Sequence, residues 1–167
     1  MAITRLGGAN AITGTIPTSV APGKGKVLQV VQVEETSAST VTSLSYTDSN
    51  LTASITPSST SSKVLVLVNQ SISQYDVNSK QIGGGIRILR GTTTIYGGVQ
   101  PYHLYMQVPS GTNTQLYYLC NLNFLDSPSS TSSITYKTQI RAYESGDTIR
   151  AQGDSMESTI TLMEIAG

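Results

Sequence analysis

The longest β-favouring run in the chain covers residues 62–73. It contains five consecutive apolar residues, Val64 to Val68, and then alternates between apolar and polar positions. An unbroken apolar run is typical of a strand covered on both faces, whereas alternation indicates half burial. We therefore predict a central strand here. Residues 51–55, which Pro57 and a polar turn follow, predict a shorter strand that forms a hairpin with it.

The same alternation predicts further strands separated by turn-forming residues. Residues 134–141 alternate most regularly, with Tyr136 directed inward and Lys137 outward. Residues 47–50 have the composition of a turn. No stretch shows helical periodicity. The other predicted strands cover residues 27–33, 41–46, 81–90, 91–98, 102–108, 115–126 and 158–165. Eight to ten strands at this spacing predict an all-β fold, a two-sheet antiparallel β-sandwich of jelly-roll type.

Three successive glycines interrupt the predicted strand at residues 81–90. Gly83, Gly84 and Gly85 offer no side chain for packing, so they indicate a bulge or a place where another part of the chain comes close. A phosphate-binding loop is the alternative. No Gly-Lys-Ser or Gly-Lys-Thr sequence follows, which disfavours it.

Residues 1–26 keep neither the strand period nor the helix period. Glycines and prolines interrupt this segment. We predict an extended N-terminal anchoring arm over residues 1–26 and one β-sandwich domain over residues 27–167. The isolated apolar residues of the arm are candidates for docking on a neighbouring subunit, and a floppy terminus is the alternative. These candidates are Ile3, Leu6, Ile12 and Ile16.

The composition of the chain supports the all-β prediction and disfavours two classes of partner, nucleic acids and membranes. Serine and threonine together make up about a quarter of the chain, which suits turns and strands respectively. The formal net charge is zero, only 12% of residues are charged, and Lys and Arg form no run. A phosphate backbone or an anionic membrane has little to hold on such a surface. We therefore expect neither nucleic acid nor a membrane as a partner, and residues 1–8 lack the pattern of a signal peptide.

Few residues bring candidate chemistry. The single Cys120 lies among apolar strand residues and is expected to be an inert thiol. His103 is the only histidine, and no Gly-x-Ser-x-Gly sequence accompanies it. Asp147, Asp154 and Glu157 lie in one loop region. They could bind a cation, or they could be ordinary turn carboxylates in contact with solvent. We predict no catalytic residue, no cofactor and no metal site, and hence no enzyme; a polysaccharide-degrading enzyme is the least favoured alternative.

Several segments, taken together and in order, resemble a family of small β-sandwich virion proteins of tailed bacteriophages, as in marine and cyanobacterial phages. Each segment alone contains only strand or turn chemistry, and together they span nearly the whole chain. The matching segments are residues 6–17, 25–31, 51–66, 86–92, 124–131, 135–141 and 161–166.

The resemblance implies a tail-fibre or surface-appendage component on the phage particle. Such a protein is made in the host cytoplasm, forms a homo-oligomer, commonly a trimer, and contacts other virion proteins through its amino-terminal arm. Its sandwich faces the host. The resemblance carries over no catalytic residue. Because no fibrous shaft precedes the sandwich, capsid decoration as a cement protein is the alternative function.

A receptor surface on such a neutral sandwich would rely on loops and on aromatic rings. Loops carry function on rigid scaffolds, and tyrosine gives contact area at low entropic cost. Residues 74–80 and 99–105 fit this description, and a host glycan or protein would be the ligand. The same tyrosines are also suited to packing between subunits. The candidate contacts are Tyr75, Asp76, Tyr102, His103 and Tyr105.

Overall fold

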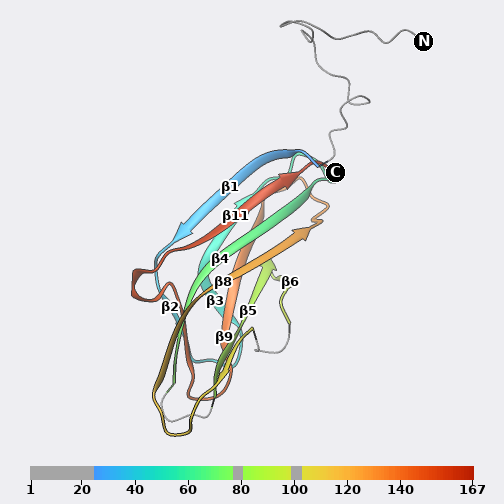
Figure 1. Ribbon diagram of the computed structural model, residues 1–167. Helices are drawn as coiled ribbons and strands as arrows, with labels where there is room; N and C mark the ends of the chain where they lie inside the picture. Colours follow the sequence, from blue (N-terminus) through green and yellow to red (C-terminus); the bar gives the residue numbers. More distant parts are fainter. Residues whose placement is uncertain (1–24, 77–80, 99–102) are drawn as a thin grey trace, which may run out of the picture.

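The computed structural model describes residues 25–76, 81–98 and 103–167, which form eleven strands and one short 3-10 turn (Figure 1). No helix in this part of the chain is long and apolar enough to cross a membrane. The candidate arm residues Ile3, Leu6, Ile12 and Ile16 and the candidate contact Tyr102 lie outside the described residues. The elements are β1 (Val27–Glu35), β2 (Ser39–Val41), β3 (Thr47–Ile55), β4 (Lys63–Asp76), β5 (Gln81–Arg90), β6 (Thr93–Tyr96), β7 (Leu104–Gln107), β8 (Thr114–Asp126), β9 (Ile134–Ala142), β10 (Thr148–Ala151), the 3-10 turn Gly153–Ser155 and β11 (Ser158–Ile165).

The strands form two antiparallel sheets. In sheet A, the central strand β4 pairs with β8 along one side. On its other side it pairs with β11 through its first half and with β10 through its second half. Strand β1 lies beyond β11, and β2 lies beyond β10. Sheet B contains β3, β9 and β5, and β5 also pairs with both β6 and β7. The prediction that residues 62–73 form a central strand is therefore confirmed.

Alternating residues from both sheets meet in one hydrophobic core. Val66 from β4 and Tyr136 and Ile140 from β9 are fully buried, while Lys137 lies on the outer face of its strand. Burial of such side chains is the main favourable term in folding, at about 25 cal/mol per Å² of apolar surface. The predicted all-β, two-sheet antiparallel sandwich is confirmed, and the arrangement is consistent with a jelly roll.

The two ends of the sandwich differ (Figure 1). At one end the backbone of Gly25 bonds to Ala166, and that of Ala166 bonds to Lys26. The chain therefore enters and leaves the sandwich at the same place, which we call the terminal end. The opposite end, where β4 finishes and the turn between β7 and β8 lies, is called the distal end.

The hairpin predicted for residues 51–55 and 62–73 is wrong. Strand β3 pairs with β9 in sheet B, and residues 56–62 cross to sheet A. Only alternate residues of β3 are buried, so this strand needs a second sheet opposite its inner face. The crossing is held by buried Glu164, whose carboxylate accepts bonds from the Ser58 amide at 2.7 Å and the Ser58 hydroxyl at 2.6 Å.

Strand boundaries near residue 47 also differ from prediction. The strand expected at residues 41–46 is wrong apart from Val41, because β2 covers Ser39–Val41 and residues 42–46 form no strand. The expected turn at residues 47–50 begins β3 instead. The turn-forming residues mark a bulge between Asp48 and Thr52, where Asn50 adopts a left-handed φ of 69°. Asparagine tolerates that conformation better than most residues. Strand β10 was not predicted.

The glycine run in β5 allows a close approach rather than a bulge. A Cβ on Gly83 would lie 2.9 Å from the Leu104 carbonyl oxygen, and one on Gly84 would lie 2.6 Å from Ile149 Cδ1. The pairing between β5 and β9 continues without a register shift. Of the two predicted explanations for these glycines, close approach is therefore the correct one.

Burial along the first half of β4 is less complete than predicted. Val64, Val66 and Val68 are 0–3% exposed, but Leu65 and Leu67 on the other face are only partly buried. Nothing in the described part of the chain covers this outer face of sheet A. In the unbroken apolar run, the valines therefore belong to the core, and the leucines belong to a partly exposed apolar surface on the outer face of sheet A.

Candidate functional site

The distal end brings together some of the predicted contact residues. Tyr75 at the end of β4 is 42% exposed, and Tyr105 in β7 is 40% exposed. The Tyr105 hydroxyl donates to Gln81 Oε1 at 2.9 Å, and His103 is exposed beside β7. Asp76 differs, because it is only 3% exposed and its side chain faces inward. It is therefore not available to a receptor.

Asp76 instead belongs to a group of carboxylates with Glu144 and Asp147. Asp147 is fully buried, and its Oδ2 accepts a bond from the Glu144 amide at 3.3 Å. Burial raises the pKa of Asp147 to about 6, and the charges of Asp76 and Glu144 add to this effect. The distal end therefore contains a carboxyl group that titrates just below neutral pH.

The raised pKa of the Asp147 carboxyl predicts that the stability of the fold depends on pH. A carboxyl whose pKa is higher in the folded protein than in the unfolded chain destabilises the fold as the pH rises between the two values. Relative to an Asp147→Asn variant, the wild type should gain on the order of 1–3 kcal/mol between pH 7 and pH 4. Urea unfolding of both proteins across this range is the measurement. Asp154→Asn, at an exposed carboxylate, is the control and should show no such difference; equal pH profiles for wild type and Asp147→Asn would contradict the assignment.

A second buried carboxylate, that of Glu164, affects the stability of the fold at low pH. Burial alone would raise the pKa of Glu164, but hydrogen bonds from Ser58 and Gln29 lower it to about 2. Its contribution to stability is therefore present above its ordinary pKa and is lost as the pH falls toward 2. Glu164 holds the terminal end together and has a structural role.

The structure does not bring the three loop carboxylates Asp147, Asp154 and Glu157 together. Asp147 lies with Asp76 and Glu144, whereas exposed Asp154 accepts a bond from the Tyr117 hydroxyl at 2.9 Å. No three Asp, Glu, His or Cys side chains of the described residues, which include every such residue in the sequence, are placed to hold a metal ion. Burial also raises the pKa of the Cys120 thiol, which disfavours the reactive thiolate.

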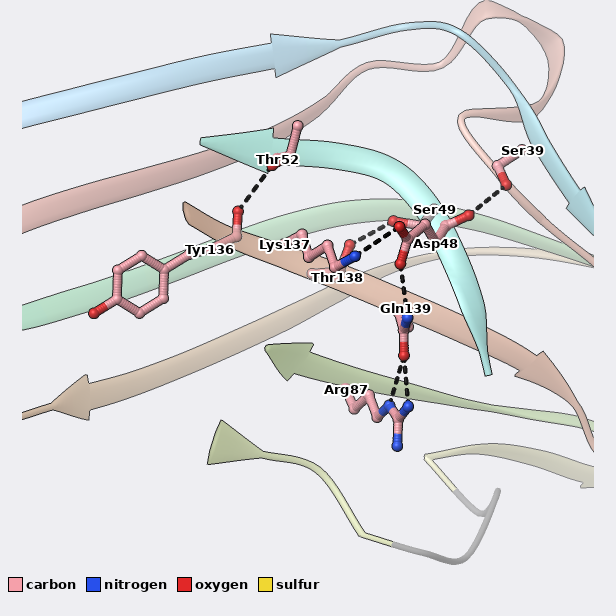
Figure 2. Close-up of polar contacts among 9 residues, drawn as sticks. All are labelled: Ser39, Asp48, Ser49, Thr52, Arg87, Tyr136, Lys137, Thr138 and Gln139. Atoms are coloured by element: carbon pink, nitrogen blue, oxygen red, sulfur yellow. Dashed lines mark hydrogen bonds and ion pairs between the residues drawn. The ribbon is translucent and has the colours of Figure 1, made fainter. Parts of the chain in front are cut away.

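A chain of polar side chains crosses the outer face of sheet B (Figure 2). The carboxylate of Asp48 accepts bonds from Lys137 Nζ and from Gln139 Nε2, each at 2.7 Å. Gln139 Oε1 in turn accepts two bonds from Arg87, at 2.9 and 2.6 Å. These residues come from β3, β9 and β5. Three strands therefore hold one continuous polar surface.

Tyr46, which precedes β3, extends this surface. The guanidinium carbon of Arg87 lies 4.2 Å from the centre of its ring, and that of Arg141 lies 5.4 Å away. The Tyr46 hydroxyl donates to the Gly98 carbonyl at 3.2 Å, and Arg141 Nη1 donates to the Leu44 carbonyl at 3.1 Å. Cations over an aromatic face are attracted by the ring, so both arginines are held in place.

Two hollows lie on this face. One has a volume of about 240 Å³ and is lined by Tyr46, Arg87, Thr94, Gly97, Gly98 and Arg141. We call it the arginine hollow. The other has a volume of about 420 Å³ and is lined mainly by β3 and β9, including Asp48, Asn50, Thr52 and Lys137. The alternation of residues 134–141 predicts that Arg141, like Lys137, points outward, but it predicts neither hollow.

The outer face of sheet A has a different, apolar character. Val30, Met163, Leu65 and Leu125 lie directly opposite one another across four strands, β1, β11, β4 and β8. Val30 and Leu125 are 55% and 47% exposed. This apolar row ends at β8, where Tyr117 and Leu119 are also about half exposed. Such a surface is typical of a protein interaction site.

Strand β8 is also an open edge of sheet A. Within the described residues its backbone pairs only with β4, in register from Thr114 to Asp126 without a bulge. From Thr114 to Leu125 it contains no charged residue and no proline. By contrast, the edge strands β1 and β3 both carry bulges and acidic residues, which discourage pairing with another chain.

Comparisons with known proteins do not assign the chain to a family. No protein-family model matches the sequence, and no curated protein sequence matches it. Among solved structures, a chain of the T13 particle of infectious bursal disease virus is similar, at 12% identity and a TM-score of 0.37, over 86% of this chain and 36% of that one. A chain from the Gx strain of the virus gives 14% identity and a TM-score of 0.37, over 93% and 41%.

Dimeric latent PorU from Porphyromonas gingivalis is also similar, at 12% identity and a TM-score of 0.33, over 86% of this chain and 14% of that one. This chain therefore spans 41% or less of the length of each of these three proteins. At these TM-scores the likeness assigns no function to this chain.

Proposed function

We propose that this chain is a non-enzymatic structural protein of a tailed-phage virion, a tail-fibre or surface-appendage component that forms a homo-oligomer and contributes to adhesion to the host. The observation that carries the proposal is the open, uncharged edge of β8 beside the exposed apolar row of sheet A. The resemblance of segments between residues 6 and 166 to small virion sandwiches supplies the setting.

The β8 edge favours contact with further copies of the same chain. An unpaired strand presents free backbone donors and acceptors to any neighbouring strand. Tyr117, Leu119 and Leu125 add exposed apolar area, and Asp126, the only charged residue of β8, is bound within the chain by Arg90. No like charges would meet if copies packed here. We propose a closed trimer in which the β8 edge of each copy meets the next copy.

The two ends of the sandwich suit an attached protein. The chain begins its first strand at the terminal end, beside the carboxyl terminus. We propose that residues 1–26 anchor this end to other virion proteins through Ile3, Leu6, Ile12 and Ile16. The distal end, with Tyr75, His103 and Tyr105, then points away from the particle, toward a host glycan or protein.

A single substitution on β8 should separate folding from assembly. Leu119→Lys places a charge on the exposed edge, so we expect it to convert the oligomer into folded monomers without loss of thermal stability. Leu28→Lys on β1 is the matched control, because Leu28 is 48% exposed and Leu119 is 53% exposed. Sedimentation velocity of both variants is the measurement. An unchanged oligomer for Leu119→Lys would show that β8 is not the interface.

The virion assignment is tested on intact particles. Antibody against the purified protein should label particles released from the host, at tail fibres or surface appendages. Quantitative mass spectrometry of the same particles gives the copy number: tens of copies support the appendage, whereas hundreds spread over the head would favour capsid decoration. Absence of the protein from purified particles would overturn both assignments.

A further inference from the structure

We infer that the outer face of sheet B binds an acidic oligosaccharide, with a carboxylate or sulfate group of the sugar held in the arginine hollow. This deepens the proposed adhesive role, on which it rests, by naming the ligand class and the site. The site is distinct from the distal tyrosines.

The arginine hollow contains two positive charges, the guanidinium groups of Arg87 and Arg141. Arg87 and Arg141 donate their hydrogen bonds to neutral acceptors, Gln139 Oε1 and the Leu44 carbonyl. The three ion pairs of the described residues involve other basic residues, Arg90, Lys137 and Arg150. On the same face, the Asp48 carboxylate is already bound by Lys137 and by Gln139. Two guanidinium groups therefore share one hollow and neither forms an ion pair, although Asp48 lies close enough to Arg87 to feel its charge.

Contacts within the chain hold the guanidinium groups of Arg87 and Arg141 in position without a ligand. Both arginines contact the ring of Tyr46, whose hydroxyl is bound by the Gly98 carbonyl. Backbone forms part of the lining beside Arg87, because Gly97 passes so close that a Cβ on Gly97 would lie 2.6 Å from Arg87 Cβ. Gly97 also has a φ of 112°, which other residues rarely adopt. Less ordering is then required on binding, and arginine matches the geometry of carboxylate and sulfate oxygens.

The sugar units outside the arginine hollow require further contacts on the outer face of sheet B. The arginine hollow is smaller than the roughly 300–1,000 Å³ of pockets for drug-sized ligands, so it suits one charged group with its ring. The second hollow lies on the same face, along β3 and β9, and is lined by Asn50, Thr52 and Lys137. Asn50 Nδ2, Thr52 Oγ1 and Lys137 Nζ already donate to Ser37, Tyr136 and Asp48, so a ligand would use the Asn50 and Thr52 side-chain oxygens as acceptors and the remaining Lys137 protons as donors. These groups suit sugar hydroxyls. An oligosaccharide crossing the Asp48–Gln139–Arg87 chain would use both hollows.

The experiment compares sugars that differ only in charge. Heparin-derived oligosaccharides, polygalacturonate oligosaccharides and neutral dextran of similar length are titrated into the full chain by calorimetry at two salt concentrations. We expect one or both acidic sugars to bind, more weakly at high salt, and dextran not to bind. Arg87→Gln/Arg141→Gln should weaken this binding at least tenfold. Arg150→Gln, which alters an arginine paired with Asp154 instead, should leave it unchanged.

A spectroscopic readout protects the test against a misfolded variant. In the wild type, the amide resonances of Arg87, Gly97, Gly98 and Arg141 should shift on titration with the acidic sugar. Equal binding of dextran, binding unaffected by the double substitution, shifts confined to other residues, or no binding at millimolar sugar would each overturn the inference. Equally tight, arginine-dependent binding of a DNA duplex would overturn the glycan assignment in favour of a general polyanion site. If host cells bind the double variant as well as wild type, the adhesive role stands and this site does not.

Discussion

Val66→Asp should abolish soluble expression of the protein. Val66 lies at the centre of β4, is fully buried and is surrounded by the core side chains of both sheets. The introduced carboxylate would have no partner there. Burying an unpaired charge costs several kcal/mol, against a total domain stability of about 5–15 kcal/mol. Soluble yield and thermal unfolding of any recovered protein are the measurements.

Two surface substitutions serve as controls for this result. Asn69→Asp introduces the same charge on the same strand but on its exposed outer face. Lys137→Ala removes a partly exposed ion pair with Asp48, and such pairs contribute about 0–1 kcal/mol. Both variants should remain soluble with stabilities within about half a kcal/mol of the wild type. Effects as large as that of Val66→Asp would contradict the assignment of the faces of β4 and β9.

Asp126→Ala should cause the second-largest loss of stability. The Asp126 carboxylate is nearly buried, and its two oxygens accept bonds from Arg90 Nη1 at 3.0 and 2.9 Å. The buried hydroxyl of Tyr136 donates to the same carboxylate at 2.8 Å. Burial and this hydrogen bond raise the pKa of Tyr136, so the tyrosine stays a neutral donor. The contact links β8 of sheet A to β5 and β9 of sheet B.

Removing the carboxylate leaves a partly buried guanidinium and a buried hydroxyl without their acceptor. Loss of one partner of a buried pair costs about 3–5 kcal/mol. Asp48→Ala is the matched control, because its pair with Lys137 is far more exposed and should be worth about 1 kcal/mol or less. Urea unfolding of the two variants measures the difference. Similar midpoints for both would show that the Asp126 contact contributes no more than a surface ion pair.

The fold class could be predicted because strand periodicity is local. The alternation at residues 134–141 correctly placed Tyr136 inside and Lys137 outside, since successive residues of a strand point to opposite faces. Pairing partners are not local. The turn after residue 55 has the composition of a hairpin turn, yet β3 pairs with β9 some eighty residues later. The turn chemistry at residues 47–50 likewise serves a bulge inside a strand.

The candidate site shows the same division. The exposure of Tyr75 and Tyr105 agrees with their prediction as surface tyrosines. Asp76 was also expected at the surface, but it occupies an inward position on β4 and packs near the turn that contains Asp147. The arginine hollow could not be predicted, because Arg87 and Arg141 come together only through the pairing of β5 with β9. Each arginine alone has the pattern of an ordinary outward strand residue.

We propose above all that this sandwich assembles with further copies of itself and that another copy of the same chain pairs with the β8 edge. Light scattering coupled to size-exclusion chromatography tests it most directly, on the full chain at micromolar concentration. We expect a single species of three times the 17.7 kDa mass of one chain. A species of one chain mass, unchanged on raising the concentration tenfold, would contradict it.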